Sequence, residues 1–238
     1  TSRADIGIGN FLFEAGYAYE LAPRSSIAIS YLPDFIQNET FENPFLTEQS
    51  RKKTDTSGHA IRFKYNGILS SAWSLDLAYY THDVDDETSG EGLVSSQDMR
   101  KLEREGSGFY SKLSYFMPLS RELRLVPALI YQNYDADGDA MSHQALAAEA
   151  SLIQQVERHT FAFTAAYQYT DFDEANPVFD KTQHHSKYKA FLAYEYNKLM
   201  GWDNWAFSML AGYNQTSANI DFYDQTQFIF GSGVSYKF

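Results

Sequence analysis

The sequence has no cysteine, few basic residues and no long apolar run. The absence of cysteine excludes a disulfide framework, a thiolate metal site and a cysteine nucleophile. No segment approaches the roughly 18 consecutive apolar residues that a membrane-spanning helix needs, and the mean hydropathy is -0.43. The 19 Lys and Arg residues are outnumbered by 31 Asp and Glu, for a net charge of -12. This balance argues against nucleic acid as a partner, because phosphate binding needs clustered basic side chains.

Aromatic side chains are abundant: they make up 16% of the 238 residues, with 18 Tyr and 18 Phe. The ring of tyrosine is amphipathic and suits a boundary between hydrocarbon and water. These residues alternate with small or polar ones, and residues 160–170 show the pattern most clearly. One face there carries Phe161, Phe163, Ala165, Tyr167 and Tyr169, and the other carries Thr160, Ala162, Thr164, Ala166 and Gln168. Such period-two alternation predicts β-strands with one apolar face.

The alternation recurs along the whole chain and predicts about twelve strands. They are expected at 2–9, 11–21, 25–36, 58–69, 72–82, 107–117, 122–134, 142–155, 158–171, 186–198, 203–216 and 225–238. These lengths bracket or exceed the about 9–11 residues with which a tilted strand crosses a bilayer. Short turns alternate with longer connections, which are expected at roughly 37–57, 83–106, 172–185 and 217–224, with a tighter one at 135–141.

Short turns on one side and long loops on the other are typical of outer-membrane barrels. The second face of the strands is Ala, Ser, Gly, Thr and Gln with isolated charges, which suits a barrel interior. A soluble sandwich or lipocalin-like fold, the alternative, would pair an apolar face rich in Val, Ile and Leu with a strongly charged face. We therefore expect the all-β class, with residues 1–238 forming a single transmembrane antiparallel up-and-down β-barrel.

The tail of the sequence, residues 231–238, resembles the C-terminal strand of bacterial outer-membrane proteins, in which alternate residues are apolar and the last is Phe. Tyr236 and Phe238 match that pattern. The resemblance implies recognition by the barrel assembly machinery. It also places the end of the last strand in the periplasm, so that the short turns are expected to be periplasmic and the long loops extracellular.

The whole chain resembles a gammaproteobacterial family of outer-membrane proteins known only as a domain of unknown function. The matching stretches are Phe13-Glu14-Ala15-Gly16-Tyr17, Ser74-Leu75-Asp76-Leu77-Ala78-Tyr79, Asp83-Val84-Asp85, Ala193-Tyr194-Glu195-Tyr196, Met200-Gly201-Trp202 and Tyr236-Lys237-Phe238. The resemblance implies no activity and no site residues. Members of the family look longer at the N-terminus, so we expect this chain to lack one or two strands of a barrel of 12 to about 14.

If the aromatic face meets lipid, the charges on the other face line the lumen. The basic ones, expected on one wall, are Arg62, Lys64, Lys112 and Arg124. The acidic ones, expected elsewhere around the ring, are Glu14, Glu149 and Glu195. Opposed walls of this kind create a transverse field that orients polar solutes in a pore. The leading expectation is a porin-like channel for passive or gated passage of small polar or charged solutes, with no enzymatic chemistry and no cofactor.

Two alternatives to the channel remain open. The same charges can pair across a narrow lumen and seal it, which would leave a structural or surface-interaction role to the long loops 37–57 and 83–106. Those loops include Arg51-Lys52-Lys53, a candidate contact for lipopolysaccharide phosphates. The second alternative is a hydrolase at the mouth of the barrel, suggested by His82-Asp83 and by His184-His185 in an expected long loop. The sequence has no nucleophile elbow of the form Gly-x-Ser-x-Gly.

Clustered acids raise the question of a metal. Asp135, Asp137 and Asp139 have the spacing that begins a calcium loop, but Leu146 stands where the loop needs its closing Glu. The preferred interpretation is a set of solvated loops near the divalent ions that bridge lipopolysaccharide, with no bound metal. The expected partners are outer-membrane lipid and lipopolysaccharide, the assembly machinery and small polar solutes.

Overall fold

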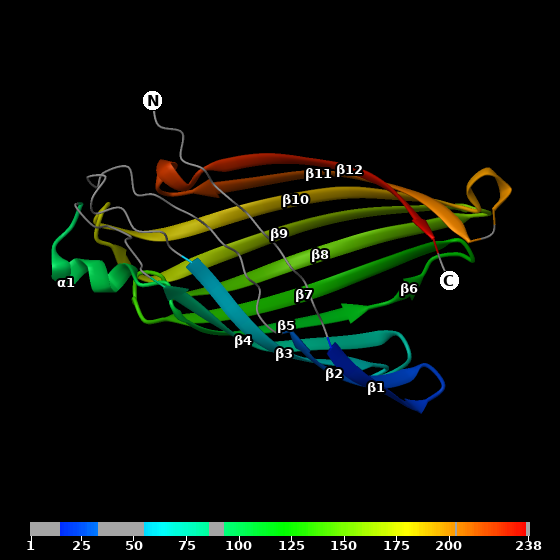
Figure 1. Cartoon of the computed structure of the whole chain (residues 1–238), viewed down its shortest axis with the longest axis horizontal. Coiled ribbons are helices and arrows are strands. Elements are labelled where there is room, and N and C mark those ends of the chain that lie inside the picture. The colour runs from blue at the N-terminus through cyan, green and yellow to red at the C-terminus, as the bar shows by residue number, and fades with distance from the viewer. Residues whose placement is uncertain (1–14, 33–54, 86–92, 203, 237–238) are drawn as a thin grey trace.

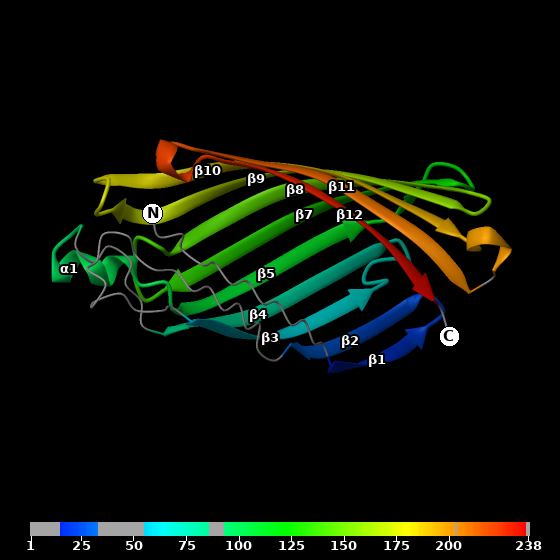
Figure 2. The same ribbon diagram turned by 45° about the horizontal axis from the view of Figure 1, so that its top comes forward.

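The computed structural model describes residues 15–32, 55–85, 93–202 and 204–236, which form one antiparallel sheet. Each long strand pairs with the next one along the chain, and the two-residue β6 continues β5 alongside β7. Figures 1 and 2 show the tilted strands curling into an arch around an interior. The strands are β1 (Ala15–Ala22), β2 (Ser25–Leu32), β3 (Asp55–Asn66), β4 (Trp73–Asp85), β5 (Gly106–Tyr115), β6 (Met117–Pro118), β7 (Leu123–Ala136), β8 (His143–Val156), β9 (His159–Asn176), β10 (Lys181–Asn197), β11 (Trp205–Ala218) and β12 (Gln225–Tyr236).

The helices are all short and lie in the connections. They are α1 (Ser96–Met99), η1 (Arg100–Leu102), η2 (Leu199–Gly201) and η3 (Asp221–Tyr223). In the described ranges, no helix is long and apolar enough to cross a membrane.

The two faces of the sheet differ as the alternation predicts. Along β8, Leu146 and Leu152 are 62% and 39% exposed, whereas their neighbours Ala145 and Ala147 are buried against the inner side. Large apolar side chains on the outside and small ones inside reverse the usual order of a water-soluble protein, because hydrocarbon is the outer solvent. The fold is the predicted transmembrane antiparallel β-barrel. In the part of the chain that the structure describes, β1 and β12 end the strand order without a ladder between them.

Aromatic side chains mark two levels on the outer face. At the end with the short turns, Phe161 packs against Tyr194 with ring centroids 5.0 Å apart, and the ring centroids of Trp205 and Tyr236 are 5.2 Å apart. Toward the end with the long loops, the rings of Tyr167 and Tyr188 are 5.1 Å apart. Two such levels are the girdles expected where a barrel meets the two membrane interfaces.

The region predicted as a long loop at 172–185 is instead mostly strand. β9 and β10 have 18 and 17 residues, more than the about 9–11 that a bilayer needs, and their hairpin projects past the outer aromatic level. The ladder is irregular between Thr182 and His184, and the residues around it are mostly polar on both faces, so the hydropathy alternation that predicts a membrane strand stops short of the turn. The prediction that His184 and His185 lie in a loop is wrong, because both are in β10.

The strand count agrees with the prediction, but the strands do not correspond one to one. The predicted strand 107–117 is divided into β5 and β6 around Phe116. The predicted strand 2–9, the residues Glu14 and Phe238, and the basic run 51–53 lie outside the described residues.

Candidate functional site

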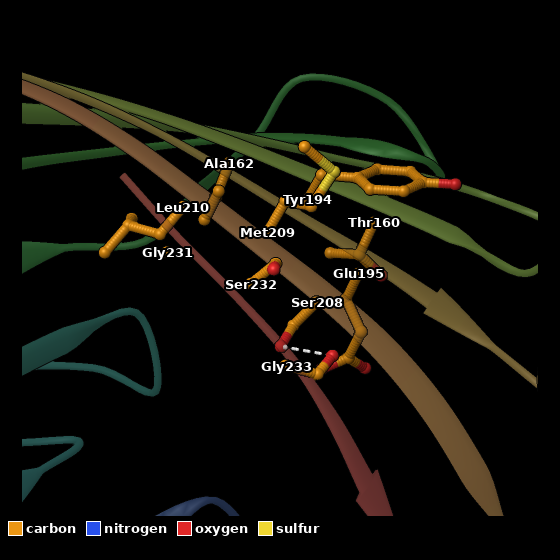
Figure 3. Close-up of a pocket in the computed structure, with 11 residues that line it drawn as sticks. Thr160, Ala162, Tyr194, Glu195, Ser208, Met209, Leu210, Gly231, Ser232 and Gly233 are labelled. Atoms are coloured by element: carbon orange, nitrogen blue, oxygen red, sulfur yellow. Dashed lines mark hydrogen bonds between the residues drawn. The ribbon is translucent and has the colours of Figure 1, made fainter. Parts of the chain in front are cut away.

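The lumen-facing side of β9 to β12 holds a hollow of about 490 Å³ near the short-turn end. Thr160, Glu195, Ser208 and Gly233 lie in one row across the four strands. Figure 3 shows Glu195 and Ser208 on the side away from Tyr194 and Met209, with Ser208 Oγ donating to the carbonyl of Gly233 over 3.4 Å. Because Gly231 and Gly233 have no side chains, β12 leaves the hollow open to the lumen here.

A second hollow, of about 410 Å³, lies near the long-loop end on the opposite part of the sheet. Its polar lining residues carry five rings, one hydroxyl and one amide: His59, Tyr80, Thr81, His82, Tyr110, Gln132 and Tyr134. Gly58, Ala60 and Ala78 supply the space between them. We call this the ring hollow.

Rings continue from this hollow around the mouth of the barrel. Tyr134 contacts His143, His143 contacts Phe172, and Phe172 contacts His185, with centroids 5.5, 5.0 and 5.0 Å apart. His185 then lies 5.6 Å from Tyr223 in η3. The ring belt therefore runs from β4 to the β11–β12 connection and consists of Tyr80, His82, Tyr134, His143, Phe172, His185 and Tyr223.

The far end of the ring belt is fixed by two hairpins that meet above the strands. Asn176, 1% exposed, donates to Tyr223 Oη over 2.9 Å, and Lys181 Nζ donates to the carbonyl of Asn219. Burial raises the pKa of the Tyr223 phenol, so this ring stays neutral. Phe179 packs on Tyr223 with centroids 5.8 Å apart.

Two lumen cations on β3 to β8, Arg62 and Lys112, are neutralised in ion pairs, and we call this part of the lumen the paired wall. The guanidinium of Arg62 makes two contacts with the carboxylate of Asp76, including Nε to Oδ1 at 2.8 Å. Lys112 Nζ lies 2.6 Å from Glu149 Oε1, reaching over β7. Glu149 therefore accompanies a basic residue instead of facing one from across the lumen.

Two lysines on β10 have no such partner, and we call β9 to β12 the lysine wall. Lys187 and Lys189 face the lumen in register with Gln168 and Ala166 on one side and with Thr216 and Asn214 on the other. Neither forms a salt bridge with an acid in the described ranges. Neither lysine is among the charges predicted to set selectivity, although their spacing of two places both on one face of a predicted strand.

The other predicted pore residues are spread along the lumen. Lys64 stands directly across from Asp76 in the β3–β4 ladder, although that carboxylate pairs with Arg62. The guanidinium of Arg124 lies over the ring of Phe116, 5.6 Å from its centroid. Glu195 belongs to the hollow of Figure 3.

The three aspartates proposed as weak metal ligands do not converge. Asp135, Asp137 and Asp139 are exposed and alternate with buried Ala136, Gly138 and Ala140. The small residues are buried where the segment of α1 and η1 packs on them. Gly138 N donates to the carbonyl of Glu103 there, and Ala140 N donates to the carbonyl of Lys101. No group of three or more His, Asp or Glu residues is placed to hold a metal ion within the described ranges.

The histidines proposed for a hydrolase are separated. His82 faces the ring hollow, where its Nδ1 lies 3.4 Å from Tyr134 Oη, while Asp83 is exposed on the other face of the strand. His184 pairs outside the lumen with Asp171, Nδ1 to Oδ1 at 2.6 Å. Within the described ranges, neither imidazole is hydrogen-bonded to a Ser or Thr hydroxyl.

Comparison with curated sequences found no match. The solved structure of LpxR from Salmonella typhimurium is similar over 94% of this chain and 88% of its own, with 11% identity and a TM-score of 0.48. The ferric yersiniabactin uptake receptor FyuA from Yersinia pestis matches 99% of this chain and 44% of its own, with 11% identity and a TM-score of 0.27. A family model described as "Protein of unknown function (DUF2860)" matches residues 1–237, and the chain belongs to that family.

Proposed function

We propose that the protein is an outer-membrane channel that lets small polar solutes, anions more readily than cations, pass through its lumen. The observation that carries this proposal is the pair of lumen-facing lysines, Lys187 and Lys189, without an acidic partner in the described chain. Side chains two apart on a strand face are roughly 7 Å from each other. An anion between the ammonium groups relieves their mutual repulsion, which favours its entry.

The balance of the remaining lumen charges has the same sign. Among the described residues outside the two ion pairs of the paired wall, the lumen carries the cations Lys64, Arg124, Lys187 and Lys189 and the acids Glu20 and Glu195. The chain as a whole is acidic, so the preference comes from the lumen and not from the total charge. Selectivity in a pore follows the charges that line it.

Small side chains on the inner face support an open path. The inward residues in the middle of β8 and β9 are mostly Ala and Thr, among them Ala147, Ala162, Thr164 and Ala166. Sealed small barrels fill this space with large side chains. We expect the long-loop end to lie outside the cell and the short turns in the periplasm, as in other outer-membrane barrels.

The test is conductance of the purified protein in a planar bilayer. In a KCl gradient, we expect steady channels whose reversal potential lies toward that of chloride. Heat-unfolded protein is the control for leakage. The absence of conductance at every voltage would contradict the channel.

A second candidate is a sealed barrel with a structural or surface-interaction role. The observation that favours it is the ion pairing of Arg62 with Asp76 and of Lys112 with Glu149, which braces the lumen from within. The same bilayer experiment separates the two functions, because a sealed barrel inserts without conducting.

A further inference from the structure

The ring hollow is lined by aromatic rings and uncharged hydrogen-bonding groups, which the passage of ions does not require. We propose that it binds a neutral saccharide of one or two rings, by stacking a sugar ring on Tyr80 and hydrogen-bonding its hydroxyls. This inference rests on the proposed channel and names the solute class that the channel carries.

The aromatic surface of the hollow is fixed before any ligand arrives. Tyr80 on β4 and Tyr134 on β7 are both paired with Gly108 on β5, which lies between them. The centroids of the two tyrosine rings are 6.0 Å apart, and the ring planes differ by 6°. A Cβ atom at Gly108 would lie 2.3 Å from Tyr80 Cζ, so only glycine lets the ring lie flat there. Gln132 Nε2 donates to Tyr80 Oη over 2.7 Å. Fixing the ring in advance removes part of the entropy cost of binding.

The polar groups of the hollow match hydroxyls. Phenols, an imidazole and an amide both donate and accept hydrogen bonds, as sugar hydroxyls do, and Tyr80, His82, Tyr110 and Gln132 bring all three to one place. The flat rings meet the apolar C–H faces of a pyranose. The volume of about 410 Å³ falls within the range of small-ligand pockets.

The same residues argue against charged ligands. No Lys, Arg, Asp or Glu lines the hollow, so an ion would give up its hydration without a countercharge. A quaternary ammonium ion can bind aromatic rings through cation–π attraction. The unpaired Lys187 and Lys189 in the same lumen oppose the entry of such a cation.

The rest of the ring belt extends the stacking surface. Beyond Tyr134 it continues through His143 and Phe172 to His185 at 5.0–5.5 Å intervals. A sugar that leaves Tyr80 therefore meets further ring faces at the mouth. We expect weak and rapidly exchanging binding, which suits a transported solute.

The experiment measures maltose binding to the full chain in two ways. Calorimetry in detergent reports binding whether or not the lumen conducts. Interruption of the single-channel current by maltose reports binding inside the pore. The variant is Tyr80→Leu, and its matched control is Tyr79→Leu, which removes the adjacent tyrosine from the outer face, where it is 53% exposed. A Gly108→Val variant displaces the Tyr80 ring without deleting it.

We expect maltose to bind in both assays, with Tyr80→Leu and Gly108→Val each raising the half-saturating concentration about tenfold. Tyr79→Leu should change it by less than about twofold, within the usual effect of a surface substitution. Heat-modifiable migration on gels verifies that each variant is folded.

The outcomes separate this inference from the channel itself. Conductance without maltose binding in either assay would overturn the saccharide site and leave the channel standing. Calorimetric binding that Tyr80→Leu weakens, in a protein that does not conduct, would support the site and overturn the channel. Binding that is equal in all variants, or tetramethylammonium bound in preference to maltose, would overturn the site.

Discussion

The two walls of the lumen use charge in opposite ways. On the paired wall, Arg62 and Lys112 each hold an acid within hydrogen-bonding distance. On the lysine wall, Lys187 and Lys189 share a strand face with each other and with neutral neighbours. A paired charge braces the barrel and adds little to the field in the lumen, whereas an unpaired charge acts on the solute. The number of charges on the inner face is therefore a poor guide to selectivity.

The strongest test of this difference removes the unpaired charges. Replacing both lysines, Lys187→Gln with Lys189→Gln, should abolish the preference for anions and move the reversal potential in a KCl gradient toward zero or toward potassium. The control is Lys181→Gln, at the exposed start of β10, which should leave the potential unchanged. An unchanged potential in the double variant would assign the selectivity to other groups.

A second substitution makes the paired wall resemble the lysine wall. Glu149→Gln leaves the ammonium of Lys112 without its acid, so we expect a stronger preference for anions than in the parent protein. The side chains of this pair are 26% and 23% exposed, and loss of one partner at such a site should lower stability by about 1–2 kcal/mol. Urea unfolding in detergent gives the second quantity.

The matched control for this substitution removes both charges of the pair. Lys112→Met with Glu149→Met should keep the parental selectivity and lie within about 1 kcal/mol of its stability, because a buried pair replaced by apolar groups is often neutral. A selectivity shift as large as that of Glu149→Gln alone would mean that the pair does act on the solute.

A smaller effect is expected at the other pair. Arg62→Gln frees the carboxylate of Asp76, but Lys64 stands directly across the ladder and can take the place of the guanidinium. The reversal potential should therefore move less than for the double lysine variant, measured in the same gradient, because one lumen cation is lost instead of two. A shift as large as that of the double variant would show that Arg62 acts on the solute despite its pairing with Asp76.

The smallest effect is expected outside the lumen, at Asp135, Asp137 and Asp139. Replacing all three by Asn should leave the melting temperature and its response to calcium or EDTA unchanged, because these exposed side chains are not grouped so as to hold a metal ion. A calcium-dependent shift that the triple variant loses would establish the metal site that the spacing suggests.

The strands and their faces could be predicted because the bilayer sorts side chains by hydropathy at every second residue. Leu146 and Phe163 face outward as the pattern requires. Ion pairs between strands are harder to predict from the sequence. Lys112 reaches Glu149 over β7, where the small Ala128 leaves room, and this contact depends on the register of three strands. The ring hollow depends on Gly108, whose role is evident only when the rings on both neighbouring strands are known.

The missed hairpin shows a second limit. Beyond the membrane, residues 171–176 and 181–185 are mostly polar on both faces, so apolar residues no longer mark every second position although both segments are strand. Asn176 and Gln183 are buried in this hairpin beyond the membrane, and Asn176 donates to Tyr223 there, although both residue types are ordinarily exposed.

The neighbour-to-neighbour strand order bears on how the barrel forms. In the part of the chain that the structure describes, each long strand pairs with the next long strand in sequence, so each hairpin closes a local loop and the contact order of these ladders is low for an all-β protein. The β9–β10 hairpin, with a four-residue turn at 177–180, has the smallest closure entropy to overcome among the connections at its end. We expect strand pairing to spread from this hairpin in both directions, and the long connections before β3 and β5 to close last.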